Sequence, residues 1–595
     1  MNMIDMLVVS VPVLDLQYPP SSPAVIKGCL RSAGYAAHTA DFNILLRDLV
    51  KEKNLEWWRE QYDFESPYLG SPTAETNSKF LFKQSTIVDE WLTRCIEVIQ
   101  QYNPRWLGIS VFCYKSHKSA LILALEVRKQ LPHIKIALGG RGASSYFLGP
   151  DHPQVKLKLK ERFGYYPTFK PFGPLLLAYN FVDYVIEGDG EVAVINLLKD
   201  TNENNLVTGR IQDIDIESIP FVDYSDYDLD KYEYIHGEPL LAITGSKGCV
   251  RKCTFCDIPV LWPKYKFRSG EHIAREMMHL NSLHGVKKFY LTDSLVNGSL
   301  NAFTDFIKTL SEHNNQSSEK ITWVGQYITK RASKRQDDEY YKMLKDSGGE
   351  GLTIGVESGS DNVRNHMKKN FSTLDVDTEL AYFDKYQITC VLLFFSCYPT
   401  ETWEDFTETI DMFIRYHKYC ASGTIYKITL GIPYTHHPDT PLWNMQDDIG
   451  LTKASGSDIL WLLDNNKELT FYERIRRRLI LQEVSVALKL PMSRNAPEIN
   501  QILNTFKLHN NSIIDFFGAK PKIEYYDDVY NITPYDTLLM PLEIQRQVYE
   551  HLNNNNHLIE HTLRLHVGLN DDISFDSDLY TELKETLING VDITN

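Results

Sequence analysis

Long apolar runs are missing from this sequence. Its 595 residues contain no window of about 18 or more uncharged, apolar residues that would span a bilayer as a helix. The apolar start, MNMIDMLVVSVPVLDL, carries Asp5 where a signal peptide carries Lys or Arg, so we predict a first buried strand there. We therefore expect a cytoplasmic protein with no membrane partner.

Basic residues are in the minority. The chain has 62 Lys and Arg against 78 Asp and Glu, which gives a net charge of −16. This balance disfavours a broad phosphate-binding face. We expect no nucleic-acid partner and a small molecule or a peptide as the substrate.

Cysteine is sparse as well. Nine cysteines in this length are too few for a disulfide scaffold. Only Cys249, Cys253 and Cys256 form a tight cluster. Most of the others are expected to be packed core thiols, namely Cys29, Cys95, Cys113, Cys390, Cys397 and Cys420.

The length suggests about three or four domains. Residues 1–210 alternate between strand and helix patterns, which predicts an α/β domain with a parallel sheet of Rossmann or flavodoxin-like type. Two aromatic and charged insertions interrupt the pattern, at 47–90 and 146–180. The second could form a lid over a ligand, although a surface insertion is the commoner interpretation.

Three further segments follow. Residues 211–240 are acidic, rich in Tyr and weakly periodic, as in a linker between domains. Residues 241–450 alternate strand and helix signals again, which predicts a partial or full α/β barrel. Residues 451–595 are expected to be mainly helical and carry no motif.

The cysteine cluster is the clearest chemical signal. Cys249, Cys253 and Cys256 lie on one short loop directly after a predicted strand, where three thiolates can bind three irons of a cubane cluster and leave the fourth iron open. A zinc site would need a fourth ligand. His272 has a suitable distance from Cys256, but the next histidine follows too late. A chance cluster of structural thiols is the other alternative.

The C-x3-C-x2-C spacing, with Phe255 before the last cysteine, resembles the radical S-adenosylmethionine (SAM) superfamily over about residues 240–445. The resemblance implies a partial (β/α)6-type barrel and a 4Fe–4S cluster on the three cysteines, with SAM chelating the open iron and Phe255 at the SAM site. It also implies a 5′-deoxyadenosyl radical that abstracts a substrate hydrogen, and an electron donor such as flavodoxin or ferredoxin.

Downstream motifs extend this resemblance. Asp293 ends a predicted strand where the family often places a polar group for the methionine end of SAM. The stretch Gly355–Ser360, followed by Met367-Lys368-Lys369, resembles the family's GxESGs…MxK pattern, which implies that Glu357 and Ser358 lie near the ribose or the methionine. Glu357 could instead be a carboxylate at a helix N-terminus, stabilised by the helix dipole.

The sequence also departs from the family's patterns. Cys397 and Tyr398 stand where the GxPgET turn has glycines, and Asp439 replaces a glycine of the closing segment. The turn is followed by a segment typical of a capped helix start. His436 and His437 could act as acid–base groups near the substrate, although solvated loop histidines are the commoner interpretation.

The N-terminal domain resembles the cobalamin-binding domain of one radical SAM class. The resemblance lies in the stretches Tyr18–Pro20, Leu30–Tyr35, Asp41–Asn43, Gly108–Phe112, Gly139-Gly140 and Asp183–Glu191. Ser110, Gly139 and Gly140 are expected at the carboxyl ends of strands, where open α/β sheets bind ligands. This resemblance makes cobalamin a third cofactor. A flavodoxin-like domain used only for packing would show similar glycines. No D-x-H-x-x-G sequence is present, so no lower cobalt ligand is assigned.

The two resemblances together imply a class B-like methyltransferase, in which the radical removes a hydrogen and methylcobalamin delivers a methyl group to an unactivated carbon. A radical cyclase, oxidase or rearrangement enzyme with a vestigial or non-methylating cobalamin domain is the alternative within enzymes. A non-catalytic cobalamin or Fe–S sensor is the alternative from another class. A methylthiotransferase is disfavoured, because it needs three more cysteines in the first domain.

Overall fold

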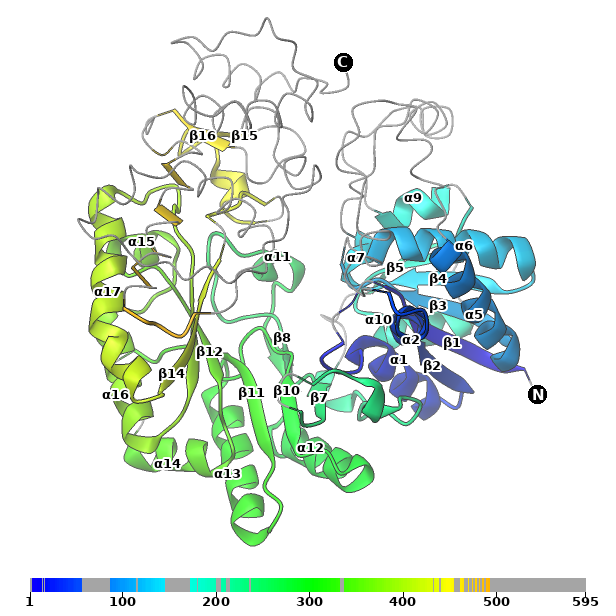
Figure 1. Cartoon of the computed structure of the whole chain (residues 1–595), viewed down its shortest axis with the longest axis horizontal. Helices are drawn as coiled ribbons and strands as arrows, with labels where there is room; N and C mark the ends of the chain where they lie inside the picture. Colours follow the sequence, from blue (N-terminus) through cyan, green and yellow to red (C-terminus); the bar gives the residue numbers. More distant parts are fainter. Residues whose placement is uncertain are drawn as a thin grey trace, which may run out of the picture. The chain divides into compact units, whose positions relative to one another are not determined.

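The computed structural model describes residues 3–55, 86–144, 172–199, 205–209, 215–331 and 337–453, apart from 13, 15, 114, 115, 179, 235, 236, 432, 438 and 439, and then short stretches between 461 and 492. Contacts divide the chain into two compact units. The first is Met1–Thr244 with Arg275–Tyr290, and the second is Gly245–Ala274 with the described residues from Leu291 onward (Figure 1). The predicted domain limits at 210, 240 and 450 stay predictions.

The first sheet has six strands in the order β2-β1-β3-β4-β5-β6, and all of its neighbouring strands are parallel. Their bounds are β1 (Ile4–Ser10), β2 (Ala37–Asp41), β3 (Pro104–Ser110), β4 (Lys135–Gly139), β5 (Tyr184–Gly188) and β6 (Leu206–Gly209). The order reverses between β1 and β3, so the flavodoxin-like prediction is confirmed and the switch point lies there.

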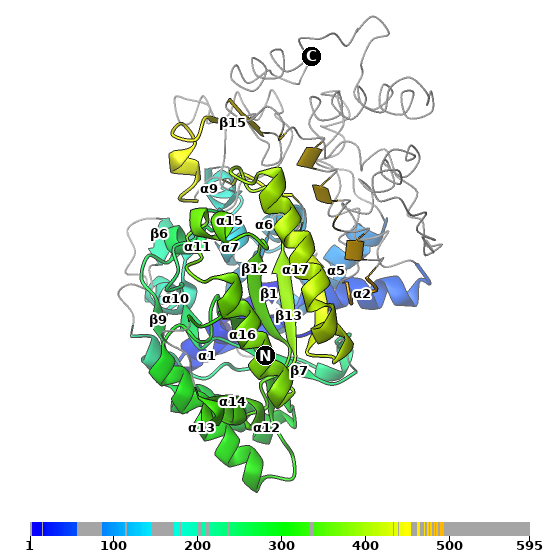
Figure 2. The same ribbon diagram turned by 90° about the vertical axis from the view of Figure 1, so that its left-hand side faces the viewer.

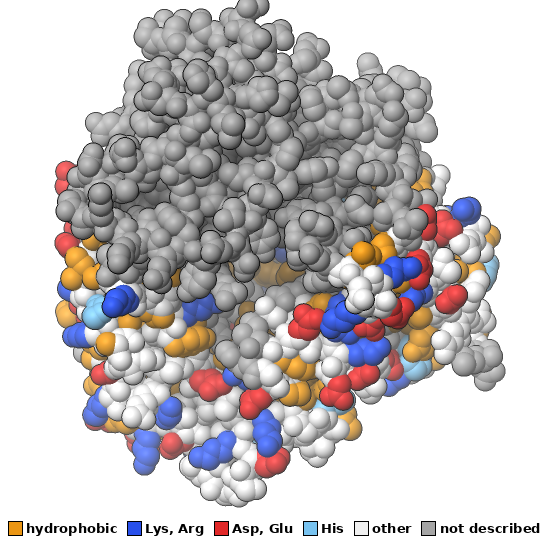
Figure 3. Space-filling view, viewed as in Figure 1, with side chains coloured by type: hydrophobic (Ala, Val, Ile, Leu, Met, Phe, Trp, Pro, Cys, Tyr) orange, Lys and Arg blue, Asp and Glu red, His pale blue; other side chains and the backbone are white. Residues whose placement is uncertain are grey.

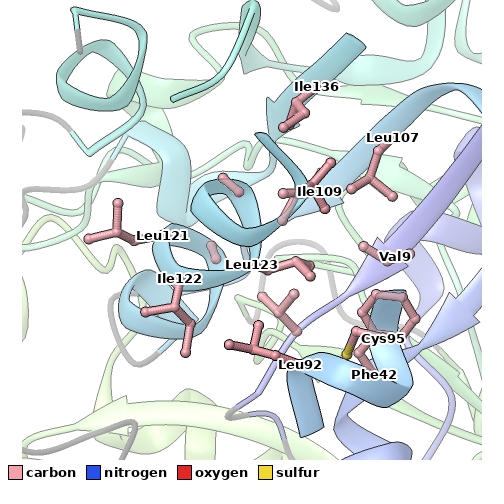
Figure 4. Packing of buried hydrophobic residues seen from close by; sticks show 14 of the residues in the cluster. Val9, Phe42, Leu92, Cys95, Leu107, Ile109, Leu121, Ile122, Leu123 and Ile136 are labelled. Atoms are coloured by element: carbon pink, nitrogen blue, oxygen red, sulfur yellow. The ribbon is translucent and has the colours of Figure 1, made fainter. Parts of the chain in front are cut away.

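Helices cover both faces of this sheet because successive side chains of its strands point to opposite faces. Leu7 and Val9 of β1 pack with α2 (Phe42–Glu52), α5 (Thr86–Tyr102) and α6 (His117–Gln130). Figure 4 shows this core, with Val9, Phe42 and Leu123 among its side chains. Met6 and Val8 belong to a second cluster with residues of α1 (Ser21–Ser32) and α10 (Gly190–Leu198). The predicted buried first strand is therefore confirmed.

Ion pairs and hydrogen bonds, some of them buried, hold the predicted linker against the rest of the first unit. The fully buried Lys27 ammonium lies 3.1 Å from Asp223 and 2.6 Å from Asp226. The Tyr232 hydroxyl donates to the Asp41 carboxylate at 2.9 Å. Because a buried ammonium is costly unless it is paired, these contacts fix the segment in place.

The second sheet also has six strands, in the order β7-β10-β11-β12-β13-β14. Their bounds are β7 (Leu240–Ile243), β10 (Lys288–Leu291), β11 (Thr322–Tyr327), β12 (Leu352–Glu357), β13 (Cys390–Phe394) and β14 (Ile425–Leu430). The registers from β11 to β14 are parallel. Strands alternate with helices along the chain, as predicted for a partial (β/α)6-type barrel.

The barrel helices lie on the outer side of the curved sheet (Figures 1 and 2). They include α13 (Leu300–Gln316), α14 (Asp338–Asp346), α16 (Thr373–Tyr386) and α17 (Trp403–Ala421). α17 begins with a capping box, in which Thr402 and Asp405 satisfy each other's backbone N–H groups. The prediction of a capped helix at this position is confirmed.

The C-terminal region is described only in part. Its described residues include a two-stranded antiparallel hairpin of β15 (Leu451–Lys453) and β16 (Trp461–Leu463). Residues 493–595, which carry most of the prediction of a mainly helical region, lie outside the described residues. So do residues 56–85 and 145–171, which make up most of the two predicted insertions.

Two surface properties bear on the sequence expectations. Within the described ranges, no helix is both long and apolar enough to span a membrane. On the face shown in Figure 3, acidic and basic side chains of the described residues are interspersed.

Candidate functional site

The cysteine loop is closed by a short antiparallel hairpin. Ser246 and Lys247 of β8 pair with Phe267 and Lys266 of β9, so the two strands bracket the loop. Gly248 directly before the first cysteine has a φ of 82°, and a Cβ there would lie 2.8 Å from the carbonyl oxygen of Lys264. Only glycine fits this turn without strain.

The three thiols interact with one another. Burial raises the pKa of each thiol, to about 12 for Cys256, and the neighbouring cysteines add to the rise for Cys253 and Cys256. The Lys369 ammonium, in contrast, lowers the pKa of the Cys249 and Cys253 thiols. Iron binds the thiolate form of cysteine. The Lys369 ammonium favours this negatively charged form and therefore favours the binding of iron.

This donor set fits a cubane cluster. Each of three thiolates binds a separate iron of such a cluster, so the sulfurs stand farther apart than around one ion. The loop supplies three thiols, one fewer than a structural zinc site needs. Its donor set therefore suits a cluster better than the zinc site considered from the sequence.

Glu357 and Lys369 form an ion pair beside the loop. Their Oε1 and Nζ atoms are 3.0 Å apart, and both side chains are largely buried. Glu357 has a φ of 71°, at a break in the register between β12 and β13. A Cβ on Gly355 would overlap the Glu357 carboxylate. The glycine of this motif is therefore required by the pair, and the left-handed Glu357 is the kind of strained residue that concentrates at functional sites.

Phe255 completes this group. The Lys369 Nζ lies 5.8 Å from the centroid of its ring, which itself packs edge-on against Phe395 at 5.2 Å. The structure therefore brings together the cysteines, Phe255 and Glu357, whose roles in binding the cluster and SAM stay predictions. Lys369 was missed as a site residue, although its place in the MxK stretch was a signal. The pKa of Lys369 is raised, because Glu357 and Cys253 outweigh the effect of burial.

Asp293 supports the start of the cysteine loop. Its buried Oδ2 accepts a hydrogen bond from the Gly245 N–H at 2.8 Å. It lines a small cavity with Ser246, Tyr265 and Arg268. Burial raises the pKa of Asp293 to about 6. These contacts connect the ends of β7 and β10, and the predicted contact of Asp293 with SAM stays a prediction.

Ser358 points into the helix layer. It is fully buried, and its Oγ lies 3.5 Å from the Thr409 Oγ1 of α17. Its predicted contact with SAM is not tested by this arrangement and stays a prediction. The acidic residue in the first turn of α15 (Asp361–His366) is Asp361. Glu357 is paired with Lys369 instead, which argues against the helix-terminus alternative, and its predicted contact with SAM stays a prediction.

The two neighbouring histidines have different environments. His437 is exposed, as expected of a solvated loop residue. His436 is fully buried, stacks on Trp443 with ring centroids 5.0 Å apart, and lies 3.0 Å from the Tyr434 hydroxyl. The solvated interpretation is therefore wrong for His436, because the Trp443 ring packs against its imidazole.

In the first unit, the predicted cobalamin residues meet at the switch point. Ser110 at the end of β3 is the register partner of Ser10 on one side and of Gly139 on the other. Gly140 has a φ of 95°, and a Cβ there would lie 2.5 Å from the Val111 carbonyl oxygen. Among the described residues, a Cβ on Gly139 would meet nothing closer than 3.8 Å. Packing of the described residues therefore explains the glycine at 140 but does not require one at 139, and the predicted contacts of Ser110, Gly139 and Gly140 with cobalamin stay predictions.

His117 contacts the segment that follows β4. Its Nε2 lies 2.8 Å from the Gly142 carbonyl oxygen, and its ring stacks on Phe172 at 4.0 Å. A carbonyl only accepts hydrogen bonds, so Nε2 carries the proton. Burial lowers the pKa of His117 to about 4, so the imidazole is neutral at physiological pH.

A family model matches most of the predicted barrel segment. Residues 243–413 match the model of the radical SAM superfamily. These residues form a radical SAM domain. This family implies an enzyme with a 4Fe–4S cluster and SAM, so these sequence predictions are confirmed.

Solved radical SAM structures share the architecture. The radical SAM methyltransferase TsrM from Kitasatospora setae, solved with cobalamin and a 4Fe–4S cluster, is 14% identical and has a TM-score of 0.54 over 92% of this chain and 100% of that chain. OxsB, a cobalamin-dependent radical enzyme solved with aqua-cobalamin and SAM, is 13% identical and has a TM-score of 0.56 over 99% of this chain and 85% of that chain. At these identities the likeness shows the fold alone.

A curated relative is found among cyclases. The anaerobic magnesium-protoporphyrin IX monomethyl ester cyclase of Synechocystis is 22% identical over 320 residues, which are 51% of this chain and 57% of the relative. The chain therefore spans little more than half of that relative's length.

We predict that Gly355→Ala destabilises this radical SAM domain by about 1–3 kcal/mol, because the added Cβ displaces the Glu357 carboxylate. Urea unfolding of the full chain measures the loss. In a Glu357→Ala background the same substitution should cost much less, since the overlapping atoms are gone. Equal costs in both backgrounds would contradict this account of the glycine.

We also predict that the first unit loses stability as the pH falls from 6.5 towards 4. The unfolded chain binds a proton at His117 in this range and the folded chain does not, so the loss reaches about 3 kcal/mol near pH 4. Hydrogen exchange at the amides of the first sheet, recorded during urea unfolding of the full chain, measures this loss of stability. His117→Phe should keep the stacking, lose stability at neutral pH and show a smaller acid loss; an unchanged acid slope would refute the assignment.

Proposed function

We propose that this radical SAM enzyme is a cobalamin-dependent methyltransferase that acts on an unactivated carbon of a small molecule or a peptide. The observation that carries the proposal is the presence, in one chain, of two equipped sites. One is the cysteine loop with the Glu357–Lys369 pair. The other is the switch point with Ser110 and Gly139.

The residues of the first site suit a cluster and SAM. Cys249, Cys253 and Cys256 would hold the cluster, which supplies the electron that cleaves SAM to methionine and a 5′-deoxyadenosyl radical. Lys369 offsets the negative charge of the thiolates. Together with Glu357 it presents an ammonium and a carboxylate, the two groups that complement the carboxylate and the amine of the methionine end through charge-assisted hydrogen bonds.

The residues of the second site suit a bulky cofactor. Ligands of open α/β sheets bind outside the carboxyl ends of the strands at the switch point, where Ser110 and Gly139 lie side by side. Gly139 leaves the backbone open, and Phe112 after β3 is 65% exposed. Such an apolar side chain and an open backbone support cobalamin binding, with the cofactor as the carrier of the methyl group.

The substrate class is inferred from charge, and the electron donor is inferred from the need to reduce the cluster. The acidic balance of the chain supports a small molecule or a peptide rather than a nucleic acid. A flavodoxin or ferredoxin is the electron donor we propose, because the cluster must be reduced from outside.

A radical cyclase is the second candidate. The similarity to the Synechocystis cyclase supports it, although that similarity covers about half of each chain. In a cyclase the first unit would hold a non-methylating cobalamin or none. The mass of the product separates the two, since methylation adds a CH₂ and oxidative ring closure removes hydrogen.

The test is anaerobic reconstitution with iron and sulfide, with and without hydroxocobalamin, followed by reduction in the presence of SAM. We expect wild-type protein to form 5′-deoxyadenosine and to retain cobalamin through gel filtration. Cys253→Ala should abolish 5′-deoxyadenosine formation and keep cobalamin. Gly139→Ala should fold normally, since its Cβ meets no described atom closer than 3.8 Å, and lose cobalamin retention while still forming 5′-deoxyadenosine.

Two results would contradict the proposal. An intact, reduced cluster that yields no 5′-deoxyadenosine would refute the radical chemistry. Deoxyadenosine formation without cobalamin retention would refute the methyltransferase and leave the cyclase.

A further inference from the structure

Thr254 lies between two of the cysteine ligands and is held on every polar atom. It is buried, and its N–H donates to the Met367 carbonyl at 3.1 Å. Its carbonyl accepts from the Leu442 N–H at 2.7 Å. Its hydroxyl lies 2.8 Å from the Tyr398 hydroxyl. The partners come from the loops after β12, β14 and β13, so one residue of the cysteine loop connects three barrel loops.

Tyr398 belongs to the turn that departs from the family's glycines. Cys397 before it takes up the conformation that glycine favours, with a φ of 65°, and its N–H donates to Glu401 Oε1 at 2.9 Å. The turn therefore forms without glycine. The Tyr398 ring then packs edge-on against Tyr434, with centroids 5.7 Å apart, and this packing directs its hydroxyl to Thr254.

The direction of this hydrogen bond follows from the third partner. The Thr254 hydroxyl also lies 3.4 Å from the His366 carbonyl oxygen, which only accepts. Thr254 therefore donates to His366 and accepts from Tyr398. A phenylalanine at 398 would keep the ring packing and leave the buried Thr254 oxygen with one donor fewer.

We propose that Tyr398 is a positioning residue of the cluster site, and that its hydrogen bond to Thr254 fixes the stretch between Cys253 and Cys256 in the shape that binds the cluster. This inference rests on the proposed cluster-binding function. It gives the non-glycine turn of this chain a role, which is to replace backbone proximity by a side-chain contact to the cysteine loop.

The test compares Tyr398→Phe, Thr254→Val and the double variant with wild type, all as full-length protein. One readout is the rate at which a ferrous chelator removes iron from the reconstituted cluster. Because a buried hydrogen bond contributes modestly to stability, we expect each single variant to lose iron about three- to tenfold faster. The double variant should be no faster than the faster single, since both remove the same bond.

A second readout does not need the cluster. Hydrogen exchange of the apo protein should accelerate at residues 249–256 in both single variants. Without the bond to Tyr398, Thr254 is held less firmly, and its own N–H bond to the Met367 carbonyl opens more often. If the wild type assembles no cluster, the proposed function fails, and the exchange data still decide whether Tyr398 orders the loop.

Two matched variants complete the design. Thr254→Ser keeps the hydroxyl and should stay within about twofold of wild type. Tyr416→Phe removes another buried tyrosine hydroxyl bond, to Asp377 at 2.7 Å, on the outer helix α17, and should leave iron release unchanged. Additive effects in the double variant, or single variants with wild-type iron release and exchange, would overturn the proposal.

Discussion

Three thiolates on one short loop repel one another, and a positive charge at the end of the barrel reduces this repulsion. Burial alone raises the pKa of all three thiols and so opposes ligand formation. The Lys369 ammonium counters the repulsion, and the Glu357 carboxylate holds that ammonium in place. Glu357 reaches it from a left-handed position, and Gly355 leaves the space for its carboxylate. The GxESGs motif can thus be understood as the support of a cation beside the cysteines.

The loop is ordered by the rest of the barrel. Connections after β12, β13 and β14 all reach Thr254, and an aromatic cluster of Phe395, Tyr398, Tyr434 and Trp461 lies behind it. The C-terminal region continues this support. The Arg474 guanidinium stacks on Trp461 at 3.7 Å, Arg477 binds Glu401 at 3.1 Å, and Arg478 donates to the Gly431 carbonyl at 2.9 Å. A region without a recognisable motif therefore stabilises the loops around the site.

Local signals were sufficient for much of the fold and part of the site. Apolar periodicity and helix caps are properties of neighbouring residues, so both parallel sheets and the capping box at Thr402 could be predicted. The cysteine spacing and Glu357 also lie within short motifs. Contacts between loops of different strands depend on the register of the sheet, which the sequence does not display. For this reason the Tyr398–Thr254 bond, the burial of His436 and the role of Lys369 were not foreseen, and Ser358 faces α17 although it adjoins Glu357.

We propose that the three cysteines hold a cluster with one iron open to SAM. Electron paramagnetic resonance of the anaerobically reconstituted and reduced protein, recorded before and after SAM is added, tests it most directly. We expect the spectrum of a reduced 4Fe–4S cluster whose g values shift when SAM binds, and a smaller shift at equal SAM concentration in Lys369→Met. A spectrum that SAM leaves unchanged, from a cluster of full iron content, would contradict it.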